Sequence, residues 1–153
     1  VAREECVVTD RFAQKMLTGK VAHDTRVLAD LIAIYCDDHH RELPRRRAET
    51  EAAALGVYGR KTPVLCAECE AHLAYGEKRR AYCPKEPKPF CAHCDTHCYS
   101  ADEAEWQRQV MRYAGPRSWR KGRTLDGIRH VLEKRKWKRE AARRAAESAT
   151  TNT

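Results

Sequence analysis

Apolar residues recur with a helical period in the first third of the chain. Four of them fall on one helical face, namely Val21, Leu28, Ile32 and Tyr35,. This period predicts a helix over residues 21–35 that ends near the polar cluster at residues 36–40, because Pro44 prevents its continuation,. Residues 1–20 show no firm period, and we interpret them as a weakly helical lead-in.

Two further helices are predicted from the same kind of pattern. Residues 65–82 form the second, with Cys66 and Cys69 pointing the same way from its first turn,. Ser100 and Glu103 form a capping box that opens the third helix,. The buried stripe of this helix is predicted to consist of Trp106, Val110 and Tyr113, and Gly115-Pro116 predicts its end,.

A fourth helix is predicted from about Leu125. Its buried residues are expected to be Ile128, Val131 and Leu132, after which the apolar period fades into a basic extension whose far end frays,. Residues 45–62 show no clear period and are interpreted as a loop with one helical turn at most. No stretch alternates in the manner of a strand, so the pattern predicts an all-α protein.

The predicted architecture is a small helical domain of about four helices, stapled by a Cys/His metal-binding knuckle. We expect a lead-in at residues 1–20, the cysteine-rich domain at residues 21–132, and a basic helical extension and tail at residues 133–153. A chain of 153 residues with two Phe and three Trp buries a modest core, which metal cross-links would stabilise,.

Cysteine spacing is the strongest chemical signal in the chain. Six of the eight cysteines lie within 33 residues, and two C-x-x-C pairs, at residues 66–69 and 91–94, are separated by 21 residues. Such pairs are typical of zinc and iron–sulfur sites. We therefore expect the chain to fold around Zn²⁺, with two sites, or around an iron–sulfur cluster.

The number of candidate ligands matches two four-ligand sites. The predicted ligands are Cys36, His40, Cys66, Cys69, Cys83, Cys91, Cys94 and Cys98, with His39 as an alternative to His40,. The favoured grouping joins Cys66 and Cys69 to Cys91 and Cys94, and leaves the other four as a second set. Alternatively, the Cys91–Cys98 knuckle resembles the close triad of a [4Fe–4S] site, with Cys83 or Cys36 as the fourth ligand.

The positive charge is concentrated in the last third of the chain. The net charge is +8; residues 106–153 hold 14 Lys and Arg against 4 acids, a net +10, and the rest of the chain is −2. This region could bind nucleic acid or another acidic partner, and it could equally be a solvated helix surface.

The composition also indicates the compartment. The longest apolar run, residues 27–35, is interrupted by Asp30, and residues 1–20 lack a signal-peptide pattern, so no membrane contact and a cytoplasmic location are expected,. The alternative, a secreted protein with four disulfides, fits the close C-x-x-C pairs less well. Because the familiar catalytic motifs are missing, an enzyme is disfavoured without being excluded.

Four ordered motifs resemble those of a known family. They are Ile34-Tyr35-Cys36 with His39-His40, Leu65-Cys66-x-x-Cys69 with Leu73-Ala74-Tyr75, Lys88-Pro89-x-Cys91-x-x-Cys94-x-x-His97-Cys98-Tyr99, and Val110-Met111-Arg112-Tyr113-Ala114-Gly115-Pro116-Arg117. Together they resemble the bacterial nitrous oxide-stimulated promoter family of small cysteine-rich proteins. The resemblance implies a role in the response to nitrosative stress, and it implies no particular reaction.

These observations favour a non-enzymatic metal-binding protein, with zinc or an iron–sulfur cluster, associated with the nitric oxide stress response. The alternative is a nucleic-acid-binding regulatory module that uses the basic C-terminal third, where Trp119 and Trp137 lie among the cationic residues,.

Overall fold

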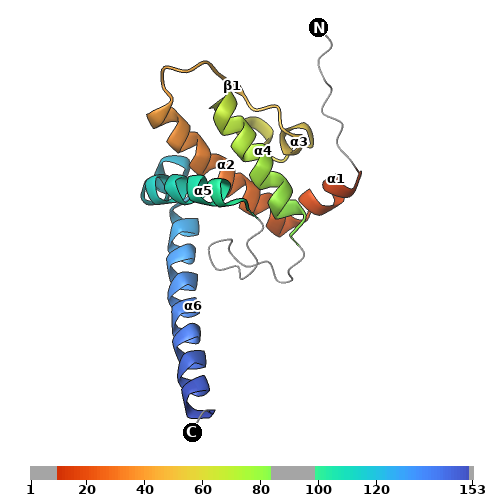
Figure 1. The fold of residues 1–153 in the computed structure, drawn as a ribbon. Coiled ribbons are helices and arrows are strands. Elements are labelled where there is room, and N and C mark those ends of the chain that lie inside the picture. Colours follow the sequence, from red (N-terminus) through yellow and green to blue (C-terminus); the bar gives the residue numbers. More distant parts are fainter. Residues whose placement is uncertain (1–9, 84–98, 152–153) are drawn as a thin grey trace.

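The computed structural model describes residues 10–83 and 99–151 (Figure 1). The elements of these residues, in chain order, are α1 (Asp10–Met16), α2 (Gly19–His39), β1 (Arg45–Arg47), α3 (Glu51–Ala54), the 3-10 helix η1 (Gly59–Lys61), β2 (Val64–Cys66), α4 (Ala67–Ala81), α5 (Ala101–Ala114), the 3-10 helix η3 (Gly115–Lys121) and α6 (Thr124–Thr151).

Helix α2 is the central element of the body. It packs against α4 and α5, and it also contacts α1 and η3. The predicted helix over residues 21–35 is confirmed and extends to His39, where the backbone N–H of His40 still donates to the carbonyl of Cys36. The chain therefore leaves α2 directly beside two of the predicted ligands.

The core lies between α2 and the helices around it. Its largest fully buried side chains include Phe12 and Met16 from α1, Ile32 from α2, Leu73 from α4 and Val110 from α5. The two α1 residues are four apart and so face the core together. Part of the predicted lead-in thus forms a regular helix, because tertiary contacts stabilise a segment that is too short to show a clear apolar period in the sequence.

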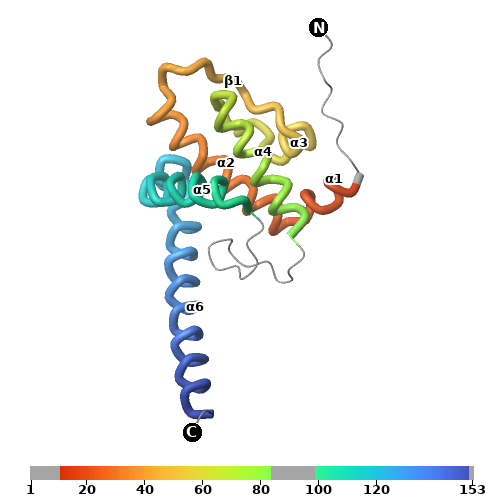
Figure 2. The backbone as a smooth tube through the Cα atoms, in the orientation of Figure 1, coloured from red at the N-terminus to blue at the C-terminus, as the bar shows by residue number. Residues whose placement is uncertain are grey.

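A small antiparallel sheet connects α2 to α4, and its presence corrects the prediction that residues 45–62 form a loop. Arg45 pairs with Cys66 and Arg47 with Val64. Along the chain, α3 and η1 form the connection from β1 to β2, as the path of the tube shows (Figure 2). Strands of three residues are too short for alternation to be visible, and an all-arginine strand has no β-forming signature.

Ser100 is the N-cap of α5, as predicted: its side chain accepts a hydrogen bond from the backbone N–H of Glu103, and α5 begins at Ala101. The reciprocal half of the capping box is replaced, because the backbone N–H of Ser100 donates to the hydroxyl of Tyr75 and Glu103 pairs with His72. Val110 is buried as predicted, whereas Trp106 and Tyr113 are half-buried against the core. Helix α5 ends at Ala114, as Gly115-Pro116 predicted, and the chain continues directly into the 3-10 helix η3, where proline is tolerated in the first turn,.

Helix α6 projects away from the body (Figure 1). The prediction that Ile128, Val131 and Leu132 are buried is wrong, since all three are exposed. A helical period shows which side chains share a face, but it does not show that another element covers that face. The first turn is anchored by Asp126, which accepts a hydrogen bond from His23 at 2.8 Å and pairs with Arg123.

The all-α expectation is confirmed for the described residues, apart from the two short strands, with six α-helices where about four were expected. Among the helices that the structure describes, none combines the length and the apolar character that a membrane span requires.

Candidate metal centre

Four metal-ligating side chains converge where α2 ends and α4 begins. They are Cys36, His40, Cys66 and Cys69, and their ligand atoms all lie within 4.8 Å of one another. Two come from the C-terminal end of α2, and two come from the junction of β2 with α4. The site therefore joins two helices that are separate in the sequence.

The end of α2 decides which of the two neighbouring histidines faces the sulfur atoms. The Nδ1 atom of His40 lies 3.2 Å from the Sγ of Cys69 and 3.4 Å from the Sγ of Cys66. His40 follows Cys36 by four residues, so both side chains leave the same face of the helix end. The Nδ1 of His39 instead lies 3.1 Å from the carbonyl oxygen of Tyr35, away from the sulfur atoms.

Cys66 has both a structural role and a place in the ligand set. It ends β2 and is the N-cap of α4, where its sulfur accepts a hydrogen bond from the backbone N–H of Cys69 at 3.5 Å. Its own backbone N–H donates to the Sγ of Cys36 at 3.3 Å. Backbone donors and the positive end of the α4 dipole both favour negative charge on these sulfur atoms.

The three thiols are almost completely buried, with exposed fractions of 2% or less. Burial raises the pKa of Cys36, and it raises the pKa of Cys69 well above its usual range, with further contributions from the neighbouring Cys36 and Cys66. Three buried thiolates repel one another unless a cation lies among them. A bound cation is therefore the condition under which this group is stable in its charged form.

The spacing of the donor atoms suits a single tetrahedral ion. With Zn–S distances of about 2.3 Å and Zn–N distances of about 2.0 Å, neighbouring sulfur and nitrogen ligands of a tetrahedron are about 3.5 Å apart. The nitrogen of His40 lies 3.2 and 3.4 Å from two of the sulfur atoms. The donors are thus already close to the arrangement that one such ion requires.

A polar clamp holds the turn of α2 that carries these ligands. Asp38 accepts hydrogen bonds from the hydroxyl of Tyr113 at 2.6 Å and from both terminal nitrogens of Arg120 at 2.7 and 3.1 Å. Arg120 first, and then Tyr113, hold the pKa of the Asp38 carboxyl well below its usual range. Sequence reasoning placed Tyr113 in a motif and Arg120 in the basic region, but no spacing could pair them with Asp38.

An aromatic group covers the same turn. The ring of Tyr35 stacks on His39 and meets His40 edge-on, with centroid distances of 4.2 and 5.7 Å. Trp106 and Tyr113 from α5 also meet Tyr35 edge-on, at 5.8 and 6.0 Å. Helix α5 therefore helps to set the position of His40 without supplying a ligand.

The observed grouping of cysteines differs from the grouping expected from the sequence. Cys66 and Cys69 lie beside Cys36 and His40, whereas spacing favoured Cys91 and Cys94 as their partners. Three predicted ligands, Cys91, Cys94 and Cys98, lie outside the described residues. Cys83, just past the end of α4, is half-buried and is not a member of the four-residue group.

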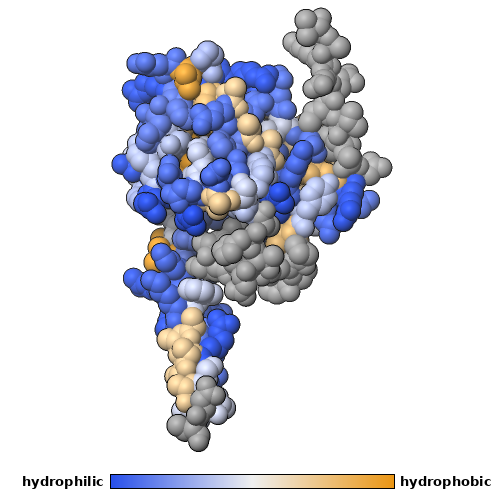
Figure 3. Space-filling model, viewed as in Figure 1, coloured by the Kyte–Doolittle hydropathy of each residue, from blue (hydrophilic) through white to orange (hydrophobic). Residues whose placement is uncertain are grey.

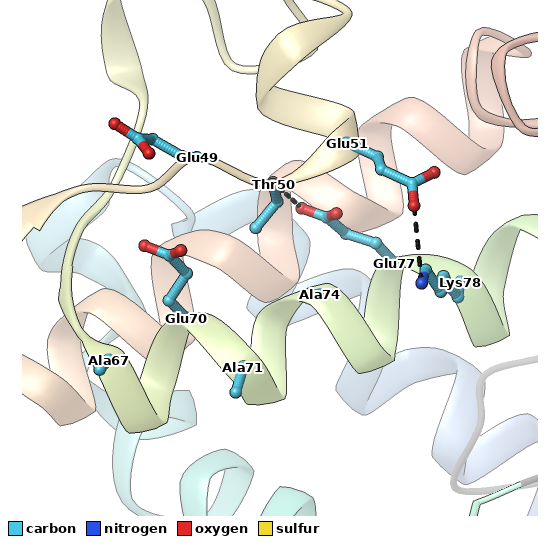
Figure 4. Close-up of a pocket in the computed structure, with 9 residues that line it drawn as sticks. All are labelled: Glu49, Thr50, Glu51, Ala67, Glu70, Ala71, Ala74, Glu77 and Lys78. Carbon is cyan, nitrogen blue, oxygen red and sulfur yellow. Dashed lines mark hydrogen bonds and ion pairs between the residues drawn. The ribbon is translucent and has the colours of Figure 1, made fainter. Parts of the chain in front are cut away.

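Away from the Cys/His group, a hollow on α4 and the segment around α3 is lined in part by four glutamates (Figure 4). Its lining consists of Glu49, Thr50, Glu51, Ala67, Glu70, Ala71, Ala74, Glu77 and Lys78. Glu77 accepts hydrogen bonds from the hydroxyls of Thr50 and Tyr58, at 2.7 and 2.6 Å, and Glu51 pairs with Lys78. Because these carboxylates already have partners, the hollow is a structural feature of the α3–α4 contact.

Comparison with known proteins agrees with the motifs in the sequence. A family model described as "Nitrous oxide-stimulated promoter" matches residues 19–143, which include all four members of the Cys/His group. "Uncharacterized protein YgbA" of Escherichia coli (strain K12) is 37% identical over 84 residues, covering 52% of this chain and 70% of that protein. No solved structure matches the chain.

Proposed function

The chain belongs to the nitrous oxide-stimulated promoter family, and on that premise we propose that it is a zinc-binding, non-enzymatic protein of the response to nitrosative stress. Cys36, His40, Cys66 and Cys69 are the proposed ligands of one zinc ion. The convergence of their four ligand atoms within 4.8 Å is the observation that carries the proposal.

The donor set favours zinc over an iron–sulfur cluster. Three thiolates and one imidazole are a common closed set for structural zinc. An iron–sulfur cluster binds its ligands on different iron atoms, so those ligands surround a larger body, and they are usually four cysteines. Four donors within 4.8 Å of one another suit one ion better than a cluster.

A second zinc site is proposed from the ligand count alone. Once Cys36, His40 and the pair at residues 66–69 form one complete set, four of the predicted ligands are left. These are Cys83, Cys91, Cys94 and Cys98, four thiols within 16 residues. Four cysteines at this spacing are sufficient for a tetrathiolate site.

The link to nitrosative stress follows from the chemistry of metal-bound thiolates. An S-nitrosothiol can transfer its nitrosonium group to a cysteine sulfur, which forms S-nitrosocysteine while the donor leaves as a free thiolate. The new S-nitroso group is neutral and binds zinc poorly, so the ion is released. A buried zinc–thiolate set in a reducing cytoplasm would therefore report or absorb nitrosating species.

Metal analysis of protein purified without oxygen tests the proposed sites. We expect a colourless protein that contains two zinc ions per chain, and one zinc ion after Cys91→Ser and Cys94→Ser are combined. A brown protein with iron would contradict the zinc assignment. Protein that contains no metal after growth with added zinc would contradict metal binding altogether.

Exposure to an S-nitrosothiol tests the proposed role separately from metal binding. Zinc release, followed with a coloured chelator, should track the formation of S-nitrosocysteine at one or more of the ligands. A zinc-loaded protein that keeps its metal at concentrations of donor that nitrosate free cysteine would contradict the stress role and leave the metal site standing.

A second candidate function is the binding of an acidic macromolecule by the basic C-terminal region. The observation in its favour is that none of the side chains of α6 is buried, so the lysines and arginines of this helix are accessible to a partner. Nucleic acid and an acidic protein surface are both compatible with the charge alone.

A further inference from the structure

Helix α6 exposes an apolar surface near its start. Its apolar quartet, defined as Leu125, Ile128, Val131 and Leu132, has exposed fractions between 48% and 79%. Orange, hydrophobic atoms are visible at the base of the projecting helix in the space-filling view (Figure 3). Four large apolar side chains exposed within about two turns form a patch of the kind that marks interaction sites.

The next two turns of the same face carry a cation triplet, defined as Arg135, Lys138 and Arg139. At about 100° per residue, the apolar quartet and the cation triplet share an arc of about 140°. No acid lies in this arc. The acids of α6 are Asp126, Glu133, Glu140 and Glu147, which recur every seven residues and fall within about 60° on another side of the helix,.

Among the described residues, no acidic side chain pairs with the triplet. Within residues 10–83 and 99–151, none of the ion pairs involves Arg135, Lys138 or Arg139. Three of the four acids of α6 instead have basic neighbours three residues later, as with Glu133 and Lys136, or Glu140 and Arg143,. The face with the quartet and the triplet is therefore both apolar and positively charged.

We propose that this face of α6 docks on a partner protein whose apolar strip is flanked by carboxylates. The proposal rests on the acidic-partner candidate above and names the class of partner. Carboxylates would pair with the cation triplet, and the apolar strip would cover the quartet, as in recognition of an amphipathic helix by a groove.

Two other occupants account for less of this surface. A nucleic acid duplex would pair with the cations, but its phosphates would leave the apolar quartet exposed to water. A second copy of α6 in parallel would cover the quartet, but it would bring Arg135 and Arg139 of one chain against the same residues of the other, where like charges repel. A second copy in antiparallel orientation, centred on the quartet, would leave the cation triplet without acidic partners.

The geometry of α6 leaves the face accessible. With 28 residues the helix is about 42 Å long,. The first turn is fixed to the body through the contacts of Asp126 with His23 and Arg123. The side chains of the quartet remain about half exposed or more, so a partner can reach them.

Binding of defined probes to the full-length, zinc-loaded protein tests the proposal. The probes are a labelled synthetic peptide with leucines on one helical face and glutamates beside them, a polyglutamate peptide of equal charge, and a DNA duplex. We expect the leucine–glutamate peptide to bind more tightly than either of the others, because it alone can meet both parts of the face.

Paired variants separate the two parts. Ile128→Ser with Leu132→Ser should weaken binding of the leucine–glutamate peptide about tenfold, and Arg135→Gln with Arg139→Gln should weaken it about tenfold while reducing its salt dependence. The matched control is Arg129→Gln with Arg144→Gln, which removes the same charge from the sector that holds the acids,. The control should stay within about twofold, and zinc content and circular dichroism should be unchanged in all variants.

Four outcomes would overturn the inference. Tighter binding of the duplex, unaffected by the serine variant, would assign the helix to nucleic acid and retain the acidic-partner candidate. A dimer that the serine variant dissociates would assign the quartet to a second copy. Equal losses in the control and the arginine variants would mean that charge acts without a defined face. No binding of any probe would reject the acidic-partner candidate itself.

Discussion

At the scale of single residues, the candidate metal centre consists of side chains that also shape the backbone. Cys66 ends a strand, caps a helix and supplies one of four converging ligand atoms. His40 is the first residue past α2, and its ring lies between the ring of Tyr35 and two sulfur atoms. Its neighbour His39 has the same side chain but faces a backbone carbonyl. This difference makes the two histidines a natural pair for testing the site.

We predict that His40→Ala lowers zinc affinity by at least about 100-fold, whereas His39→Ala changes it by less than about threefold. Loss of a residue that only orients a ligand costs 10- to 100-fold, so loss of the ligand itself should cost at least the upper end of that range. Competition with a chelator of known affinity measures both variants. Equal affinities would show that His40 does not bind the ion.

The buried carboxyl of Glu77 makes a pH-dependent contribution to stability. Its exposed fraction is 1%, and burial raises its pKa above the ordinary value of 4.5, although hydrogen bonds from Tyr58 and Thr50 act in the opposite direction. As the pH rises from the ordinary pKa of the carboxyl to its raised pKa in the folded protein, Glu77 loses its proton first in the unfolded state. The free energy of unfolding therefore falls across that window.

We predict that Glu77→Gln removes this contribution, since an amide does not titrate. The wild-type protein should lose stability relative to the variant as pH rises above about 4.5. Urea unfolding of both proteins at a series of pH values measures the difference, and the shared zinc sites cancel in the comparison. A difference that grows in favour of the wild type with rising pH would reverse the sign and contradict the assignment.

At the scale of elements, the helices were predictable and the strands were not. The apolar period of residues 21–35 persists over about four turns, and α5 has a serine N-cap, so local signals agree with the fold,. β1 and β2 are three residues each, and β1 consists of arginines. Their pairing comes from tertiary context, in which the end of α2 and the start of α4 are brought together.

The N-cap of α5 offers a test at this scale. Ser100→Ala should lower the free energy of unfolding by about 1 kcal/mol, because the backbone N–H of Glu103 loses its acceptor,. Ser100→Asp keeps an acceptor at the same position and should leave stability within about 0.5 kcal/mol of the wild type. Chemical denaturation measures both. Similar losses in the two variants would show that the hydroxyl acts through some other contact.

At the scale of the whole molecule, the body and α6 depend on different forces. The body has a modest core and a Cys/His group that joins the end of α2 to the start of α4. Helix α6 extends from it with no buried side chain. Stability should therefore depend on the metal and hardly at all on the C-terminal extension.

We predict that removal of zinc lowers the melting temperature by at least about 10 °C, while deletion of residues 134–153 changes it by less than about 2 °C. Zinc binding contributes several kcal/mol to folding, and each kcal/mol is worth about 2–4 °C in a chain of this size. The deletion keeps Asp126 and its contacts with His23 and Arg123. Thermal unfolding with and without a chelator measures both, and a large loss on deletion would show that α6 supports the body.

The sequence by itself determined the longer helices and the types of side chain that form the candidate metal site. Helical period, capping residues and cysteine spacing are local properties, so they can be read over a few residues at a time. It also predicted that Cys36 and a histidine join the cysteines downstream, from the number of ligands alone. Neither the choice of His40 nor the identity of its partners followed from that count.

Only the tertiary structure decided which residues meet. The pairing of Arg45 with Cys66 places the start of α4 beside the end of α2, and Cys36 and Cys66 come together across 30 residues of chain. The same packing leaves Ile128 and Leu132 exposed, although their period resembles that of a buried helix. Spacing along the chain limits which groups can share a helix face, whereas contacts between distant segments depend on how the whole chain packs.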